Sequence, residues 1–197
     1  LGRSMTGLAD YVVQEQSLRR LLDECDPYEN PFMATRMLIA RVDLFLATRT
    51  RQNKKAVEDL ARLIRSKMTY EGDYAFVIRR PKGWSSMNKP VNSWDEQPSC
   101  AIGGCMLALA RYLEEVKDPE LLDLLGRWTR FFLDHSGTVD RQGRYKGLTH
   151  AGGILTAGAG ALRYGALVGD KRVIDWVRRM FDGTLTHGRS CGWVPDG

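Results

Sequence analysis

The chain has 197 residues, which is enough for one domain with a substantial hydrophobic core. Its hydrophobic content of 43% and charged content of 27% are ordinary for a soluble globular protein, and no apolar run is long enough to span a membrane. The net charge of +5 is spread without a dense basic block, which argues against a nucleic-acid partner. No signal-peptide pattern opens the sequence, so we expect one soluble domain over residues 1–197.

Helical periodicity of apolar residues dominates the chain. Asn30-Pro31 and Asp118-Pro119 are each a capping residue followed by a first-turn proline, which is a typical start of a helix. Residues 74–78 predict one short strand within a long connection. In chain order, helices are predicted over residues 6–25, 30–48, 54–68, 97–116, 118–133, 150–168 and 170–184. The predicted fold class is therefore all-α.

Part of the second half of the chain repeats itself. Arg111 and Tyr112 recur as Arg163 and Tyr164, a displacement of 52 residues (163 − 111). A period of this size is typical of a repeated helical hairpin. The same displacement relates three further pairs: Asp118 and Asp170, Asp123 and Asp175, Arg127 and Arg179.

The two helices of each hairpin differ in kind. The first, over residues 101–110 and again over 151–161, is apolar and small almost all round, which indicates burial on every side. Its glycines cost roughly 1 kcal/mol each relative to alanine, and close helix-to-helix approach is the simplest compensation. The second helix is amphipathic, so it is expected to cover the first and to face water. The predicted core stripes are Leu121, Leu122, Leu125 and Trp128 in one hairpin, and Val173, Ile174, Val177 and Phe181 in the other.

Inner helices joined to outer helices by tight turns, at Lys117-Asp118 and Gly169-Asp170, predict a double-layered helical barrel or a solenoid arc. Long connections precede the inner helices, and their polar and aromatic residues are the candidates for function. Tryptophan rings could stack on sugar rings there, while two carboxyl groups could hydrolyse a glycosidic bond. The candidate catalytic residues are Asp95, Glu96, Asp196 and His150, and the candidate substrate-binding residues are Trp84, Trp94, Arg144, Tyr145 and Trp193.

These candidates also have structural interpretations. Asp95 and Glu96 could stabilise a helix N-terminus, His150 could belong to a helix cap, and Trp84 and Trp193 could anchor loops. The sequence has no metal-ligand spacing, no phosphate-binding glycine loop and no CxxC pair, so neither a metal nor a cofactor is expected. The residues that recur in both hairpins are interpreted as architectural: Arg111, Tyr112, Arg163 and Tyr164.

Three segments give the chain a resemblance to a known group. They are the run from Gly103 to Tyr112 followed by Asp118, the run from His150 to Tyr164 followed by Gly169-Asp170, and Gly192-Trp193-Val194-Pro195-Asp196, which is similar to a GWVPE-type loop. The chain thereby resembles the six-hairpin (α/α)6-toroid glycosidase-like proteins, nearest to the β-L-arabinofuranosidase-like glycoside hydrolases. The resemblance covers about the last half of the chain and implies a toroid that acts on carbohydrate.

The chain departs from that group in two ways. It holds about three and a half of the six hairpins, so the domain is expected to be all or an incomplete portion of a toroid. Nothing in it matches the cysteine and glutamate metal-nucleophile site of the arabinofuranosidases. A glycoside hydrolase is the favoured hypothesis. The alternatives are a polysaccharide lyase, with Tyr145 or His150 as base and Arg144 neutralising a uronate, and a non-enzymatic helical-repeat binding module.

Overall fold

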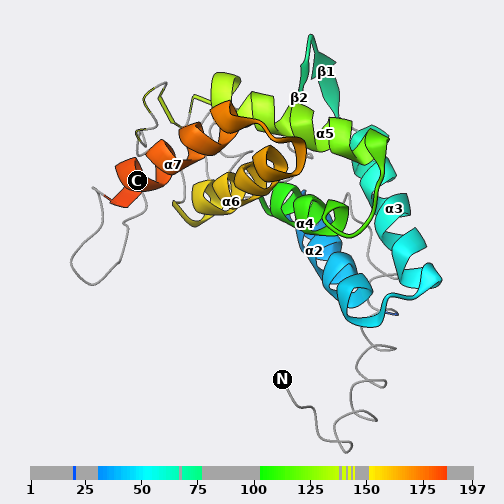
Figure 1. The fold of residues 1–197 in the computed structure, drawn as a ribbon. Coiled ribbons are helices and arrows are strands. Elements are labelled where there is room, and N and C mark those ends of the chain that lie inside the picture. The colour runs from blue at the N-terminus through cyan, green and yellow to red at the C-terminus, as the bar shows by residue number, and fades with distance from the viewer. Residues whose placement is uncertain are drawn as a thin grey trace, which may run out of the picture.

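The computed structural model describes residues 20, 31–66, 68–76, 103–137, 139–140, 142, 144 and 151–185. This part of the chain is mostly helical, with one small β-hairpin (Figure 1). The helices are α2 (Pro31–Thr48), α3 (Arg51–Ser66), α4 (Gly103–Leu113), α5 (Pro119–Arg130), α6 (Ala151–Val168) and α7 (Lys171–Leu185). A π-helical turn, η2 (Phe131–His135), continues α5, and the strands are β1 (Thr69–Glu71) and β2 (Tyr74–Phe76). The helical class is therefore confirmed, while the helix predicted over residues 6–25 lies outside the described residues.

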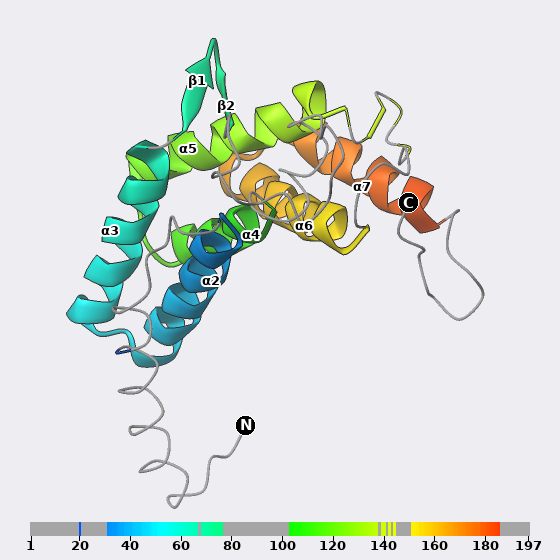
Figure 2. The same ribbon diagram turned by 180° about the vertical axis from the view of Figure 1, so that it is seen from behind.

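The helices form two layers. α2, α4 and α6 lie side by side, and α3, α5 and α7 lie along one side of that row (Figures 1 and 2). Two ion pairs, Asp43 with Arg111 and Arg49 with Glu115, join α2 to the end of α4 at 2.6 and 3.0 Å. Arg49 follows Asp43 in the sequence, and its partner Glu115 follows Arg111, so α2 and α4 run parallel. The predicted inner and outer helices are therefore both present.

α4 and α6 approach each other at backbone distance. A Cβ atom at Gly160 would lie 2.7 Å from the backbone nitrogen of Leu107 and 2.7 Å from the carbonyl carbon of Met106. Further along α6, Arg163 donates to the two carboxylate oxygens of Glu114, just beyond the end of α4, at 2.6 and 2.7 Å. Arg163 follows Gly160 in the sequence, and Glu114 follows Met106 and Leu107, so α6 runs parallel to α4. Close helix approach, the predicted reason for glycine in the inner helices, is confirmed at this position.

The prediction that inner helices are buried on every side holds for most of α4 and is wrong for α6. In α6, Gly158 and Gly165 face side chains of α7, but a Cβ atom at Gly152 would meet nothing within 4 Å. Leu162 and Ala166 are exposed as well. The composition of the two helices is similar, but α4 has an inner neighbour on each side, α2 and α6. Among the described helices, α6 has such a neighbour only in α4.

The outer helices are amphipathic, as predicted, but two of the predicted stripes are rotated. α3 buries Val57, Leu60, Ala61 and Ile64 along one face. In α5 and α7, Leu122, Ile174 and Phe181 are only half-buried, whereas Leu124, Trp176 and Met180 are fully buried. Trp176 meets the ring of Phe132 edge-on, with centroids 5.5 Å apart. Which residues lie at the middle of each buried stripe thus depends on the neighbouring rings and helices. The periodicity of one helix carries no information about those neighbours.

The turns of the two hairpins differ. Gly169 has a φ of +72°, so α6 ends in the left-handed conformation that glycine adopts without a steric cost. α4 instead ends at Leu113, earlier than the predicted Val116, because the amide of Glu115 bonds to the third carbonyl before it, that of Tyr112, at 3.1 Å. The connection between α4 and α5 therefore begins directly after Leu113, whereas a turn at residues 117–118 alone was predicted.

The predicted strand is present as β2, which pairs antiparallel with β1, Thr69 opposite Phe76. The β-hairpin packs against the end of α5. There the helix widens into the π-helical turn η2, in which the Ser136 amide donates to the carbonyl of Phe131, five residues before it. This turn brings two rings to the hairpin: Phe131 stacks on Phe76 and His135 stacks on Tyr74, with centroids 5.6 and 3.9 Å apart. Periodicity predicted an uninterrupted helix over 118–133, so the widened turn is a correction that the β-hairpin explains.

Two alanine substitutions in α6 test the close helix approach. Gly160→Ala is expected to lower the free energy of unfolding by about 2 kcal/mol, because the new methyl group meets backbone atoms of α4 that cannot rotate away. Gly152→Ala is the matched control, since open space surrounds its Cβ position. It is expected to raise stability by up to about 1 kcal/mol through helix propensity. Urea unfolding followed by circular dichroism measures both, and equal effects would contradict the assignment.

Candidate functional site

Most of the predicted site residues lie outside the part of the chain that the structure describes. Arg144 is the exception, and it is exposed. The others are Trp84, Trp94, Asp95, Glu96, Tyr145, His150, Trp193 and Asp196. Their roles therefore stay predictions.

Arg144 is held by an acidic residue that sequence reasoning missed. Its Nε donates to Oδ2 of Asp140 at 2.7 Å, and its backbone N–H donates to Oδ1 at 2.9 Å. The Gln142 N–H also donates to Oδ1, and the Asp140 N–H returns a bond to the Arg144 carbonyl. The backbone hydrogen bond from Arg144, reinforced by its guanidinium and by Gln142, holds the pKa of Asp140 below its usual value. Arg144 thus closes its own turn, which favours a structural role over free substrate binding.

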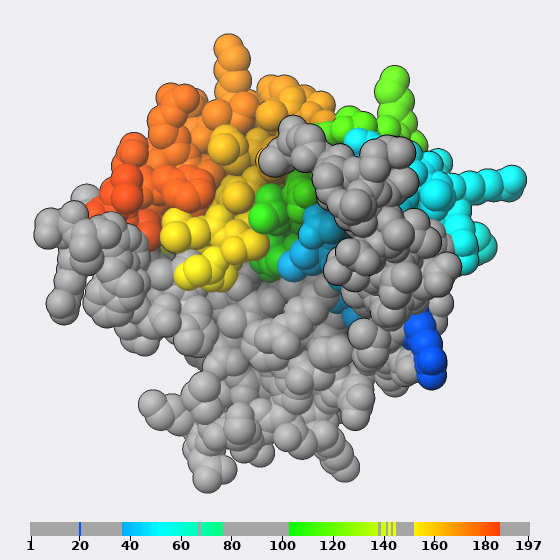
Figure 3. Space-filling model, turned by 90° about the horizontal axis from the view of Figure 1, so that it is seen from below, coloured from blue at the N-terminus to red at the C-terminus, as the bar shows by residue number. Residues whose placement is uncertain are grey.

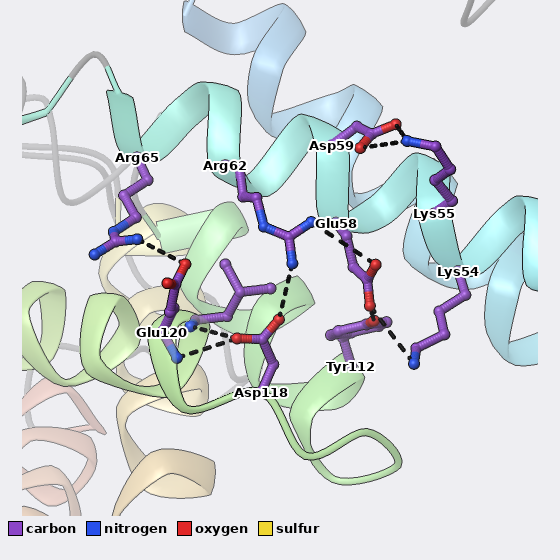
Figure 4. Close-up of polar contacts among 10 residues, drawn as sticks. Lys54, Lys55, Glu58, Asp59, Arg62, Arg65, Tyr112, Asp118 and Glu120 are labelled. Carbon is purple, nitrogen blue, oxygen red and sulfur yellow. Dashed lines mark hydrogen bonds and ion pairs between the residues drawn. The ribbon is translucent and has the colours of Figure 1, made fainter.

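The clearest polar cluster in the described residues lies where α3, the end of α4 and the start of α5 meet (Figure 4). The hydroxyl of Tyr112 donates to Oε1 of Glu58 at 3.0 Å. Arg62 lies between two carboxylates, 3.8 Å from Glu58 and 3.6 Å from Asp118. Lys54 is 3.6 Å from Glu58 on the other side. The cluster therefore joins two outer helices to one inner helix.

Asp118 has a second role as the N-cap of α5. Its Oδ1 accepts from the amides of Glu120 and Leu121, both at 3.1 Å, while Oδ2 faces Arg62. Glu120 in turn pairs with Arg65 of α3 at 2.9 Å (Figure 4). One carboxylate therefore satisfies the free amides of a helix start and faces a cation on the neighbouring outer helix. This double use leaves Asp118 little capacity for chemistry.

The repeated tyrosines occupy equivalent places. Tyr112 of α4 reaches the outer helix α3 at Glu58, and Tyr164 of α6 reaches the outer helix α5, where a Cβ atom at Gly126 would lie 2.7 Å from its hydroxyl oxygen. Each tyrosine thus packs its inner helix against the outer helix of the preceding hairpin. The repeated arginines join neighbouring inner helices in the same way, through Asp43 and Glu114. The architectural interpretation of these four repeated residues is supported.

Burial, followed by the hydrogen bond from Tyr112 to Glu58 and the charge of Glu58, raises the pKa of Tyr112 above its ordinary value of 10.0. The neutral phenol therefore contributes stability that is fully present below pH 10.0. That contribution is lost as the pH rises towards and through the folded-state pKa. The cluster is therefore interpreted as a structural contact whose contribution to stability falls at alkaline pH, rather than as an acid–base group that titrates near neutrality.

Substitution of Tyr112 tests this junction. Tyr112→Phe is expected to lower the free energy of unfolding by about 1–2 kcal/mol near neutral pH, because a hydrogen bond to a carboxylate is lost. It is also expected to flatten the fall in stability above about pH 10, where the tyrosine of the unfolded chain ionises. Tyr70→Phe, at an exposed position, is the control and should keep the parent's pH dependence. Urea unfolding across this range measures both, and a variant at Tyr112 that falls as steeply as the parent would refute the assignment.

Among the described residues, no group of three or more histidine, cysteine, aspartate or glutamate side chains is placed to hold a metal ion. None of the described helices is long and apolar enough to cross a membrane. Cys105 is buried within α4 as a small core residue.

No protein-family model, curated protein or solved structure matches this chain.

Proposed function

We propose that this chain forms all or part of an (α/α) toroid and that it is a glycoside hydrolase-like protein acting on a saccharide. The two-layer packing supports the toroid, because α2, α4 and α6 are parallel neighbours and the outer helices lie along one side of them. Stacked helical hairpins of this kind curve through a small rotation at each repeat. The resemblance of the last half of the sequence to six-hairpin glycosidase-like proteins supports a closed ring over an open arc.

The shared direction of α4 and α6 is the observation that carries the proposed site. Parallel inner helices begin at the same end of their layer, so the segments that precede Gly103 and Ala151 in the sequence lead to that end. One segment contains Trp94, Asp95 and Glu96, and the other ends at His150. The described polar cluster around Tyr112 lies at the opposite end of α4, and its side chains are committed to one another.

The chemistry proposed for the site needs two carboxyl groups. One of Asp95, Glu96 and Asp196 protonates the leaving oxygen of the glycosidic bond, and a second serves as base or nucleophile. His150 supports this exchange or contacts a sugar hydroxyl. The faces of Trp94 and Trp193 stack on sugar rings, and the remaining binding contacts are assigned to Trp84 and Tyr145.

Single isosteric substitutions test the hydrolase. Asp95→Asn, Glu96→Gln and Asp196→Asn are assayed on the saccharides that the parent cleaves in a panel of 4-nitrophenyl glycosides and plant or microbial oligosaccharides. Loss of an essential acid or base is expected to lower kcat/KM by about 100-fold or more in two of the three variants. Asp59→Asn, which removes an exposed carboxylate paired with Lys55 on α3, is the matched control and should keep full activity.

The same panel separates the alternatives. Full activity in all three variants would place the site elsewhere. An unsaturated product, detected by its ultraviolet absorbance, would identify a lyase instead. Saccharide binding without any turnover by the parent would favour the non-enzymatic binding module.

A further inference from the structure

The β-hairpin stands on the outer layer of helices, where side chains of α5 hold it (Figure 1). Arg127 donates to the carbonyl of Gly72 at 3.1 Å, and Arg130 donates to the carbonyl of Asp73 at 2.6 Å. Figure 3 shows the molecule from below, the opposite side, where α2, α4 and α6 reach the surface next to one another. The junction between α5 and the hairpin therefore belongs to the outer helices and is separate from the inner row.

At the base of the hairpin, a thioether is the hydrogen-bond partner of a buried indole. The Nε1–H of Trp128 donates to Sδ of Met68 at 3.4 Å. Trp128 has no exposed surface, so bulk water cannot replace this acceptor. Among the residues that the structure describes, Met68 supplies the acceptor for this donor. Because a thioether sulfur is a weak acceptor, the buried N–H is bonded less strongly than an oxygen would bond it.

Met68 is also the methionine most open to solvent among those whose burial the structure describes. It directly precedes β1, and its side chain is half-buried. The other three have 3% exposure or less: Met37, Met106 and Met180. Oxidation of methionine requires access of the oxidant to the sulfur. A small oxidant in solution therefore reaches Met68 before these three.

We propose that Met68 is a reversible oxidation site, at which the sulfoxide oxygen accepts the hydrogen bond from Trp128. The oxidant is a peroxide. A lone pair of the sulfur bonds to one peroxide oxygen, the O–O bond breaks, and hydrogen peroxide leaves as water, so the sulfur is oxidised and the peroxide is reduced. Two thiols of a methionine sulfoxide reductase reverse the step, because they take up the oxygen as water, become a disulfide and restore the thioether.

The contact with Trp128 distinguishes this site from ordinary oxidative damage. In an apolar core, a sulfoxide is a polar group without a partner and disrupts the packing. Beside Met68 lies a donor that lacks a strong acceptor, and the flexible methionine side chain can turn the new oxygen towards it. Oxidation is therefore expected to preserve the fold and to strengthen the bond that joins the base of the hairpin to α5.

Peroxide treatment followed by peptide mass mapping tests whether Met68 is the site. In the folded protein, Met68 is expected to gain an oxygen atom about 10-fold faster than Met106 or Met180, because only its side chain is open to solvent. Unfolding the parent in urea before the treatment is the control, and it should remove the difference.

The indole N–H resonance of Trp128 tests the hydrogen bond. In a proton–nitrogen correlation spectrum it is expected to move downfield when Met68 is oxidised, because a stronger acceptor deshields the proton, and methionine sulfoxide reductase should return it. Met68→Leu is the matched control, since leucine has a similar volume and no sulfur. Peroxide should leave the Trp128 resonance of this variant in place.

A further substitution separates the hydrogen bond from the packing. Met68→Gln places an amide oxygen near the position of the sulfoxide oxygen, so it is expected to unfold at a higher urea concentration than Met68→Leu, which leaves the indole N–H without an acceptor. In a Trp128→Phe background the indole N–H is absent, and the advantage of Met68→Gln over Met68→Leu should disappear.

Equal oxidation rates for Met68 and the buried methionines overturn the proposal. A Trp128 resonance that stays in place while Met68 is oxidised overturns it as well. So does loss of the helical circular dichroism signal on oxidation of Met68, since that result identifies damage. None of these measurements depends on activity towards saccharides, so this proposal and the proposed hydrolase can fail separately.

Discussion

Backbone contact between α4 and α6 at Gly160 sets the spacing of the inner row, and much of the described fold depends on it. A side chain at this position would have to occupy space held by the backbone of Met106 and Leu107, so only glycine lets the two helices come this close. At this spacing, Arg163 of α6 reaches Glu114 just beyond the end of α4. The tight inner row also gives the outer helices a continuous surface on which to bury their apolar stripes.

Polar contacts then fix each hairpin to the one before it. Tyr112 and Tyr164 hold inner helices to the preceding outer helices, and Arg111 and Arg163 join neighbouring inner helices. Each exposed ion pair contributes little alone, since solvent screens it. The hydrogen bond between buried Tyr112 and Glu58 is better protected, and its geometry selects one orientation of α4 against α3. The C-terminal end of α4 is thereby committed to structure, and we propose that chemistry belongs to the opposite end of the layer.

Local patterns predicted the helices well, because periodicity, capping residues and first-turn prolines act within a few residues of one another. The six described helices overlap six predicted ones. The misses come from contacts between distant segments. The widened turn after α5 follows from stacking on Tyr74 and Phe76, and the stripe of α7 is centred on Trp176 by its contact with Phe132. The early end of α4 is a different case, because it follows from a local hydrogen bond between Glu115 and Tyr112. Of the predicted site residues, the structure describes Arg144. Its bond to Asp140, four residues earlier, depends on the geometry of the turn between them, which the spacing alone does not specify.

The sequence by itself determined the helical class, the order of inner and outer helices and the recurrence of Arg-Tyr pairs, because these follow from hydrophobic periodicity and a constant displacement. Only the tertiary structure decided what the recurring residues touch, and which glycines allow close approach. Gly152 and Gly160 belong to the same small-residue run, yet one faces open space and the other faces the backbone of α4. That difference depends on which helices surround α6. The sequence pattern of one helix does not show which other helix packs against it, because that neighbour comes from a distant part of the chain.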